Sequence, residues 1–333
     1  LPENPETKRR LKSLMDVTGL IGELTCPQAA PATEADLRRV HPAHYLDKFK
    51  EICAAGGGEM IQGTPFGPDG FDIAAQSAGL VKEALLSVMR GKARNAYALS
   101  RPPGHHCLPD QSMGFCLLAN IAIAIEAALA EGLASRVAVV DWDVHHGNGT
   151  EAIFLDRGDV LTISLHQENN FPRDTGGVAT RGTGNGEGFN VNIPLLPGSG
   201  HDSYLYAFER IVAPSLRDFK PDAIVVACGF DASGLDPLSR MLAAAETFRE
   251  MTARMMTLAD ELCDGRLVLA HEGGYSEVYV PFCGHAVIQA LSRSSITAPD
   301  PFEERLRKQQ PNERFQALQR TILDEYAVQF GID

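Results

Sequence analysis

The sequence predicts an α/β fold: a single domain with a central, mostly parallel sheet and helices on both faces. Short apolar runs of strand length recur at residues 96–99, 137–141, 160–165, 223–229 and 267–271. Each run ends in a polar or glycine-containing loop, and longer segments with helical periodicity lie between the runs. Alternation of strand, loop and helix is typical of a parallel sheet that is covered by helices.

The composition indicates a globular protein and argues against nucleic-acid binding. Of the 333 residues, 44% are hydrophobic and 22% are charged, which supplies enough apolar side chains for a sizeable core. The length allows one or two domains, and we expect one over residues 1–333. The formal net charge of -13 disfavours a nucleic-acid partner, but it is compatible with a cationic substrate.

Cysteine usage and hydropathy predict a cytoplasmic protein. Seven cysteines are scattered without a Cys-x-x-Cys pair, which favours a reducing compartment over a disulfide framework. No stretch reaches the about 18 apolar residues that indicate a membrane span, and the first residues do not resemble a signal peptide. We therefore expect no membrane association. Because the chain starts with Leu1 rather than Met, we expect that a short segment precedes it.

The first third of the chain predicts helices and one long loop. Residues 8–17 combine basic side chains with leucines, and Thr33 precedes acidic residues as a helix cap does. Residues 56–72 are rich in glycine and proline, which predicts a loop. This loop lacks the Lys-Ser/Thr ending of a phosphate-binding P-loop. The Ala- and Leu-rich residues 71–90 predict a packed helix.

Two pairs of histidines occur in the first half. His41 and His44 are separated by a proline, which favours a structural role over metal binding. His105 and His106 follow the apolar run 96–99 and a Pro-Pro-Gly turn. Such a turn is rigid, so it holds the two histidines still. A fixed imidazole suits general acid–base catalysis, because proton transfer requires a positioned group.

The run 137–141 leads into the most informative stretch of the chain. Asp143 and His145 follow it, two residues apart, so in an extended backbone their side chains face the same way. A carboxylate and an imidazole on one side of a strand end form two corners of a divalent metal site. A polar strand end, with Asp141 and Asp143 capping nearby amides, is the alternative for this motif considered alone.

Two later strands also end in polar groups. Asp236 precedes a proline in the loop after run 223–229, which makes it a candidate third metal ligand. Tyr275 follows run 267–271 beyond two glycines that allow a sharp turn. In parallel sheets function gathers beyond the carboxyl ends of the strands. The sequence therefore predicts that these side chains meet the histidine pair at one edge of the sheet.

The remaining segments predict supporting elements. We expect helices over residues 118–129 and 201–216, and a strand over 189–194. Residues 182–188 are glycine-rich but lack the G-x-G-x-x-G spacing, so they predict a surface loop rather than a dinucleotide site. From residue 301 the chain is amphipathic and charged, which predicts a terminal helix, either at a subunit contact or on the free surface.

Together these residues predict metal-assisted amide hydrolysis. Two carboxylates and one imidazole bind Zn²⁺ and leave a position open for water. A nearby histidine accepts the proton of that water and later donates to the leaving nitrogen. A tyrosine hydroxyl stabilises the developing oxyanion, an effect of about 3–4 kcal/mol in typical enzymes.

At this point the sequence resembles a known family, the class II histone deacetylases and their bacterial amidohydrolase relatives in the arginase/deacetylase superfamily. The resemblance extends roughly from Pro5 to Leu291, and its combined motifs are highly specific. It rests on Arg101-Pro-Pro-Gly104-His105-His106, Asp141-Trp-Asp143-Val-His145-His146-Gly-Asn-Gly149, Gly229-Phe-Asp-Ala-Ser-Gly-Leu-Asp236-Pro237 and Glu272-Gly-Gly-Tyr275.

The resemblance implies a role for each matching residue. It implies zinc ligands at Asp143, His145 and Asp236. It makes His106 the general base and acid, with His105 as its electrostatic partner and Tyr275 as the oxyanion donor. Asp141 would orient His105, and Asn148 would partner His106, where class I relatives have an acid.

The resemblance also implies one or two structural potassium sites and a substrate tunnel. The first potassium site would use Asp141, Asp143, His145, Ser164 and Leu165, and the second backbone oxygens around Phe154, Arg157 and Val160. The tunnel would be lined by Gly114, Phe115, Phe171 and Leu238.

The substrate class implied is an acylated amine or amide, for example an acetyl-lysine-like group or a small-molecule amide. Leu238 stands where a polyamine-specific relative carries an acid, which disfavours an acetylpolyamine as substrate. Asp110 and Glu168, near the expected mouth of the tunnel, keep this substrate as an alternative. An arginase-like enzyme would need an acid at Gly147. A catalytically silent binding protein would lack Tyr275 or a ligand. We further expect a homo-oligomer, a dimer or a tetramer.

Overall fold

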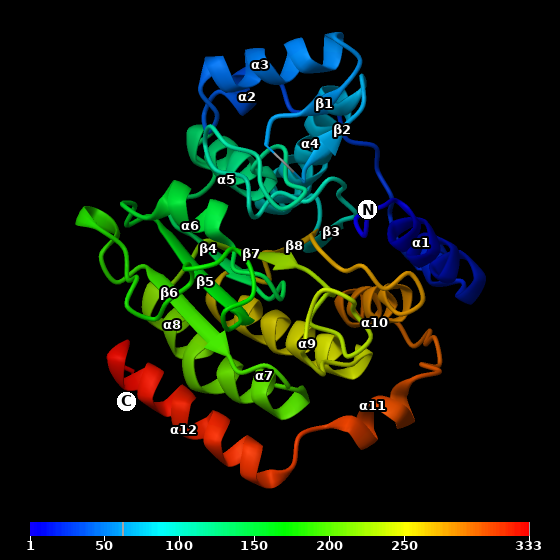
Figure 1. Cartoon of the computed structure of the whole chain (residues 1–333), viewed down its shortest axis with the longest axis vertical. Coiled ribbons are helices and arrows are strands. Elements are labelled where there is room, and N and C mark those ends of the chain that lie inside the picture. Colours follow the sequence, from blue (N-terminus) through cyan, green and yellow to red (C-terminus); the bar gives the residue numbers. More distant parts are fainter. Residues whose placement is uncertain (62, 333) are drawn as a thin grey trace.

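A six-stranded parallel sheet forms the centre of the computed structural model, which describes residues 1–61 and 63–332 (Figure 1). Every neighbouring pair of strands in this sheet runs parallel. The order across the sheet is β3 (Asn95–Ala98), β8 (Leu267–His271), β7 (Ala223–Cys228), β4 (Val137–Asp141), β5 (Val160–Gln167) and β6 (Asn190–Leu195). The predicted fold class is confirmed.

Helices cover both faces of the sheet, so its strands are apolar on both sides. Within β4, Val137 and Val139 pack in one hydrophobic core, whereas Ala138 and Val140 pack in the other. This alternation follows from the two-residue repeat of a strand. The first core includes side chains of α3 (Ala43–Ala54), α4 (Gly70–Met89) and α5 (Asn120–Ala130). The second includes those of α7 (His201–Ala207), α8 (Ala213–Phe219), α9 (Ala245–Leu262) and α10 (Val280–Ser292).

The first helix packs outside these two cores. Helix α1 (Glu6–Thr18) lies against α10, and Leu11, Met15 and Leu20 form a small hydrophobic cluster with Ile288. Glu3, which precedes α1, binds the guanidinium of Arg101 with two hydrogen bonds of 2.9 Å. The N-terminal segment is thereby tied to the turn that follows β3.

Several predicted elements are confirmed, with small differences at their ends. Thr33 caps α2 (Glu34–Leu37), where its hydroxyl accepts a hydrogen bond from the amide of Asp36 at 3.2 Å. The helix expected at 201–216 continues to residue 219 as α7, a wider π-helical turn (Phe208–Val212) and α8. The glycine-rich residues 182–188 form a loop with one short 3₁₀ turn, as expected.

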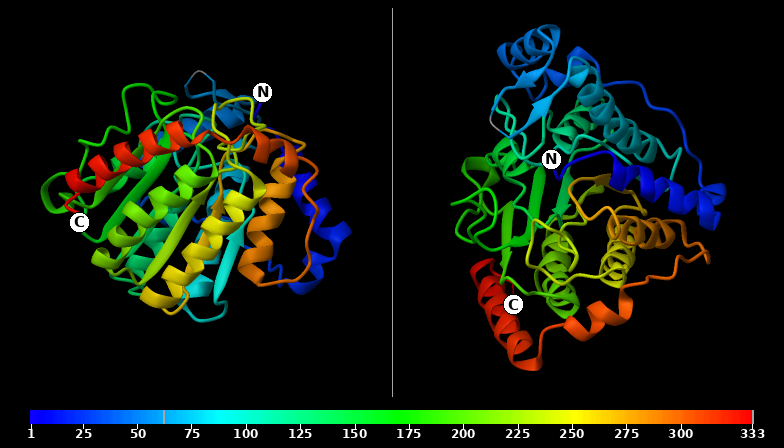
Figure 2. Two further views of the ribbon diagram at one scale, coloured as in Figure 1. Left: turned by 90° about the horizontal axis from the view of Figure 1, so that it is seen from below. Right: turned by 45° about the vertical axis from the view of Figure 1, so that its right-hand side comes forward.

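Two expectations are wrong in detail. The loop predicted at 56–72 contains a two-stranded antiparallel sheet, β1 (Gly58–Glu59) with β2 (Pro65–Phe66). The tail forms two helices, α11 (Glu303–Gln309) and α12 (Glu313–Gln329), because Pro311 interrupts it and Asn312 caps the second helix. Helix α12 lies beside α7 (Figure 2).

Helix α6 (Asn148–Phe154) begins shortly after His145 and His146. No helix in the described ranges combines the length and the apolar character needed to cross a bilayer.

Candidate active site and metal centre

A buried group of two carboxylates and one imidazole lies beyond the carboxyl ends of β4 and β7. Asp143 and Asp231 are completely buried, and His145 is 6% exposed. The Nδ1 atom of His145 lies 3.1 Å from Asp143 Oδ1 and 3.1 Å from Asp231 Oδ2. One potential ligand atom from each of the three residues lies within 4.8 Å of the others. The group therefore has the donor types and the spacing of a divalent metal site.

The electrostatics of this group also fit a cation. Burial and the charge of Asp143 raise the pKa of Asp231 to about 6. Burial alone would lower the pKa of His145, but the carboxylates of Asp231 and Asp143 raise it to about 10. A divalent ion among the three side chains would replace the proton on the imidazole and compensate the buried negative charge.

Asp236, the predicted third ligand, lies beside this group. Its Oδ1 accepts the amide of Leu238 at 2.9 Å, and its Oδ2 accepts the amide of Tyr275 at 2.7 Å. Burial and the charge of Asp231 raise its pKa to about 7. No role was predicted for Asp231, although it belongs to the motif Gly229-Phe-Asp-Ala-Ser-Gly-Leu-Asp236-Pro237. Its position three residues after β7, like that of Asp143 shortly after β4, was the available signal.

The tandem histidines stand over the same strand ends, as predicted. His105 donates from Nδ1 to Asp141 Oδ2 at 2.9 Å, and its Nε2 lies 3.7 Å from Asp143 Oδ1. His106 donates from Nδ1 to Asn148 Oδ1 at 2.7 Å. The centroids of the two imidazole rings are 3.9 Å apart.

The two histidines have opposite proton affinities. For His105, burial is outweighed by the charges of Asp143 and Asp141, which raise its pKa well above the usual value. For His106, burial and the neighbouring charge of His105 lower the pKa well below the usual value. His105 therefore favours the cation and His106 the neutral ring. With its Nδ1 hydrogen directed at Asn148, neutral His106 keeps a lone pair on Nε2 that accepts a proton.

Tyr275 lies near His145. Its ring centroid lies 6.4 Å from that of His145 and 5.9 Å from that of Phe115. The backbone reaches this position through Gly274, whose φ of +121° disfavours other residues. Burial and the nearby charge of Asp231 raise the pKa of Tyr275 well above its usual value, so the hydroxyl keeps its proton as a donor.

The aromatic residues predicted to line a tunnel flank the same histidines. The ring of Phe171 lies 5.0 Å from that of His106, and its side chain is 38% exposed. Phe115 and Gly114 both have positive φ, 67° and 53°. A Cβ at Gly114 would clash with the ring of His106, so the turn passes directly over the base. Leu238 is partly buried, and its carbonyl accepts the side-chain amide of Asn170 at 3.3 Å.

Two of the five residues of the first predicted potassium site line one small cavity. Asp141 and Ser164 pair across β4 and β5, and both line a cavity of about 10 Å³. Leu165 is the next buried residue of β5. The residues of the second predicted site lie in one turn, where the amide of Arg157 donates to Phe154 at 3.0 Å, and Val160 begins β5.

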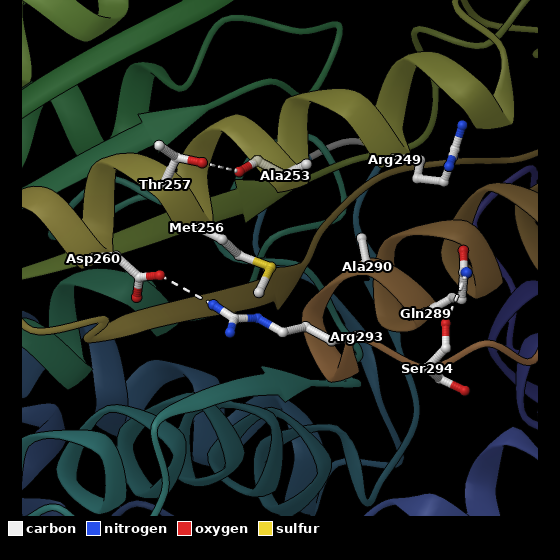
Figure 3. A pocket seen from close by; sticks show the side chains of 9 residues that line it. All are labelled: Arg249, Ala253, Met256, Thr257, Asp260, Gln289, Ala290, Arg293 and Ser294. Atoms are coloured by element: carbon white, nitrogen blue, oxygen red, sulfur yellow. Dashed lines mark hydrogen bonds and ion pairs between the residues drawn. The ribbon is translucent and has the colours of Figure 1, made fainter.

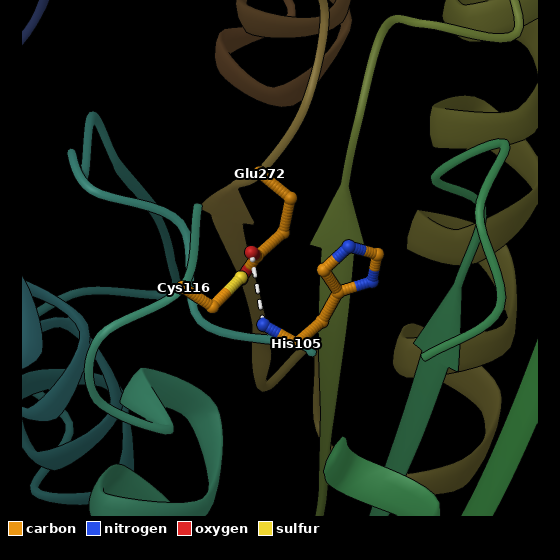
Figure 4. A group of neighbouring side chains, drawn as sticks. All are labelled: His105, Cys116 and Glu272. Atoms are coloured by element: carbon orange, nitrogen blue, oxygen red, sulfur yellow. Dashed lines mark hydrogen bonds between the residues drawn. The ribbon is translucent and has the colours of Figure 1, made fainter. Parts of the chain in front are cut away.

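A second group of potential ligands, His105, Cys116 and Glu272, is joined by a backbone contact (Figure 4). The imidazole of His105 points away from the other two side chains, and its nitrogens face Asp141 and Asp143. What joins this group is a hydrogen bond from the backbone amide of His105 to Glu272 Oε2.

The largest groove that we describe, about 360 Å³, lies elsewhere, between α9 and the end of α10 (Figure 3). Its charged side chains are already paired, because Asp260 binds Arg293 at 3.0 Å and Arg249 binds Glu246. No predicted site residue lines it. His41 is likewise structural: it donates to Pro109 at 2.7 Å and accepts the amide of Ala119 at 3.0 Å.

Comparison with known proteins agrees with this geometry. Residues 1–291 match the histone deacetylase domain. The chain is 57% identical over 330 residues to the histone deacetylase-like amidohydrolase of Pseudomonas aeruginosa, covering 99% of this chain and 87% of that protein. It is 37% identical over 303 residues to a probable deacetylase of Archaeoglobus fulgidus, covering 89% and 84% of the two chains.

A solved structure shows the same fold. The crystal structure of the HDA15 HD domain superposes with a TM-score of 0.87 at 31% identity, covering 99% of this chain and 90% of that one. With a family match over most of its length, closely similar relatives and a buried site of the required kind, the chain belongs to the histone deacetylase family and is a hydrolytic deacetylase of the amidohydrolase type.

Proposed function

We propose that the protein is a zinc-dependent deacylase that hydrolyses a linear acyl amide of the acetyl-lysine type. The observation that carries the proposal is the buried group of Asp143, His145 and Asp231 beneath a neutral histidine, His106, and a protonated tyrosine, Tyr275. These are the parts that amide hydrolysis requires: a metal centre, a base and an oxyanion donor.

Asp143 and His145 would hold the zinc together with a carboxylate from the loop after β7. The spacing in the structure favours Asp231 as that third ligand, whereas the family resemblance favours Asp236. When bound, zinc would supply Lewis acidity toward the amide carbonyl and make a water molecule acidic enough to attack near neutral pH. The remaining chemistry belongs to side chains of the protein.

His106 would act as general base and then as general acid. Its Nε2 accepts a proton because burial keeps the ring neutral, and Asn148 fixes the orientation of the ring through Nδ1. His105, held by Asp141, would stay charged beside it. The same Nε2 would return the proton to the leaving amine, which completes the hydrolysis.

Tyr275 would donate a hydrogen bond to the oxyanion that forms at the carbonyl carbon. Its phenol remains protonated, and its backbone is fixed by the hydrogen bond to Asp236. A preorganised donor of this kind stabilises the transition state without reorganisation during the reaction.

The substrate would be an acyl group on a slender aliphatic amine. Phe171 lies next to the ring of His106, and Phe115 lies next to that of Tyr275, so two aromatic rings would contact an extended methylene chain that reaches the site. Leu238 at the same opening provides no charge for a distal ammonium, so we favour acetyl-lysine or a small-molecule amide over an acetylpolyamine.

Bound monovalent ions would stabilise the structure around the site. We propose potassium near Asp141, Asp143, His145, Ser164 and Leu165, and a second ion near Phe154, Arg157 and Val160. The cavity beside Asp141 and Ser164, lined by oxygen-bearing side chains, supports the first. We also propose that the protein works in the cytoplasm as a homo-oligomer.

Hydrolysis of a matched panel tests the proposed substrate class. The panel contains an acetyl-lysine peptide, its trifluoroacetyl counterpart, an acetylpolyamine and a simple aryl amide, each with and without a chelator. We expect chelator-sensitive release, fastest from the acyl-lysine peptides. Preferential release from the acetylpolyamine would overturn the substrate class, and no release from any compound by the zinc-loaded protein would overturn the activity.

A further inference from the structure

The side chain of Glu272 is completely buried at the end of β8, next to the catalytic histidines, and the mechanism above does not use it. Strand β8 pairs with β3, and Ala98 lies opposite Ala270. The segments that follow the two strands are therefore neighbours. One of them is the Pro-Pro-Gly turn that carries His105 and His106, and the other begins with Glu272.

A single oxygen of Glu272 binds two successive amides of that turn. Its Oε2 accepts the amide of Gly104 at 2.6 Å and that of His105 at 3.2 Å (Figure 4). These amides are buried outside any helix or strand, so they have no regular backbone partner, and leaving them unpaired would destabilise the turn. A Cβ at Gly104 would also lie 2.6 Å from the amide of Asn120, so the turn has little room to move.

Glu272 is itself held from two sides. Its amide donates to the carbonyl of Cys228 at 3.1 Å, which ties it to β7. Its carbonyl accepts from the buried ammonium of Lys8 at 3.4 Å, which ties it to α1. The same N-terminal segment reaches the other end of the turn, because Glu3 binds Arg101. The position of Glu272 is thus fixed, and the hydrogen bonds of its carboxylate fix the position of the turn.

We infer, on the basis of the proposed function, that Glu272 is a positioning residue that holds the tandem histidines through one acceptor oxygen. The second oxygen, Oε1, is buried and has no hydrogen-bond partner among the described residues. Holding the turn requires only an acceptor at the Oε2 position, which a neutral amide oxygen also supplies. The charge of Glu272 is a separate matter, because it adds to those that raise the pKa of His105.

Two variants separate this role from a role of the charge. Glu272→Gln keeps the acceptor at the same reach and removes the charge. Glu272→Asp keeps the charge and withdraws the acceptor by one methylene. We expect kcat of the Gln variant to stay within about threefold of wild type, and kcat of the Asp variant to fall about tenfold to a hundredfold, because small misplacement of a catalytic group has effects of this size. KM and bound zinc should change little in both.

The ring nitrogen resonances of the histidines give a reading that does not depend on turnover. In NMR spectra, those of His106 should be unchanged in Glu272→Gln and shifted in Glu272→Asp, while those of His41 stay constant in both. A loss of kcat in the Gln variant, or wild-type kcat and resonances in the Asp variant, would overturn the inference. Failure of the proposed function is distinguishable, because it would show as inactive wild-type enzyme with this spectral pattern intact.

Discussion

At the scale of single residues, the surroundings of a side chain decide its protonation state more than the residue type does. His105 and His106 are adjacent and identical, yet the carboxylates of Asp143 and Asp141 favour the cation on one, and burial with the neighbouring charge of His105 favours the neutral form of the other. The pair resembles other sites in which neighbouring groups are driven to different protonation states so that one is ready to accept a proton.

Tyr275 makes the clearest prediction at this scale. Tyr275→Phe removes one hydroxyl and leaves the backbone contact with Asp236 intact. We expect zinc content to remain unchanged and kcat to fall about 10²- to 10³-fold, because a preorganised oxyanion donor is lost. Steady-state kinetics with metal analysis measures both. Tyr326→Phe on α12 is the control, and equal activity of the two variants would show that the Tyr275 hydroxyl has no catalytic role.

The sequence was sufficient to find most of these residues because each follows a recognisable strand. Asp143, His145 and the histidine pair come directly after buried runs, where parallel strands place function. It predicted Asp236 as the third ligand and gave no role to Asp231, which the structure groups with Asp143 and His145. Asp231 and Asp236 lie in one irregular loop without periodicity, and only the folded loop shows which carboxylate approaches His145.

At the scale of elements, the loop after β5 carries Phe171 and is fastened by a buried polar network. Glu151 of α6 accepts hydrogen bonds from His146, Asn190 and Asn192. All three partners also form hydrogen bonds with residues of the loop. His146 contacts Thr175, Asn192 donates to Gly177 and Asn190 donates to Thr180. His166 donates to Gly176 at 3.0 Å. This network joins β5, β6 and α6, so no local sequence pattern predicts it.

Neighbouring glycines test whether this fastening positions the tunnel wall. At Gly176 φ is +72° and a Cβ would clash with the ring of His166, whereas a Cβ at Gly177 would meet nothing within 4 Å. We expect Gly176→Ala to raise KM for an acyl-lysine peptide about tenfold with a smaller change in kcat, because Phe171 shifts. Gly177→Ala should behave as wild type. Equal KM values in both variants would show that this network does not affect substrate binding.

His41 predicts how acid affects stability. Burial lowers its pKa from 6.5 to about 4, so the folded chain resists protonation that the unfolded chain accepts. The stabilisation that neutral His41 contributes to the fold is complete above pH 6.5. It is lost as the pH falls toward 4, which lowers the free energy of unfolding by about 3 kcal/mol. His166, lowered to about 3, acts in the same direction.

Urea unfolding between pH 7 and pH 4.5 measures this dependence. His41→Gln should unfold with a shallower dependence on pH than wild type, since one such group is gone. The same slope in both proteins would mean that His41 does not contribute to acid sensitivity.

At the scale of the whole molecule, six parallel strands bring side chains from distant parts of the sequence to one edge. The tandem histidines follow β3, the candidate metal ligands follow β4 and β7, and Tyr275 follows β8. The alternation of strands and helices was predictable because it is a local pattern. The docking of α1 on α10, which brings Lys8 to Glu272, was not, since it depends on packing between the two ends of the chain.

Zinc titration of the metal-free protein tests the metal-centred mechanism most directly. Hydrolysis of an acetyl-lysine peptide is followed while zinc is added back after chelation, for wild type and for Asp143→Asn. We predict no hydrolysis without metal, recovery that is complete at about one zinc per chain, and no recovery in the variant. Undiminished hydrolysis by the metal-free protein, or full recovery in Asp143→Asn, would contradict a catalytic metal at Asp143 and His145.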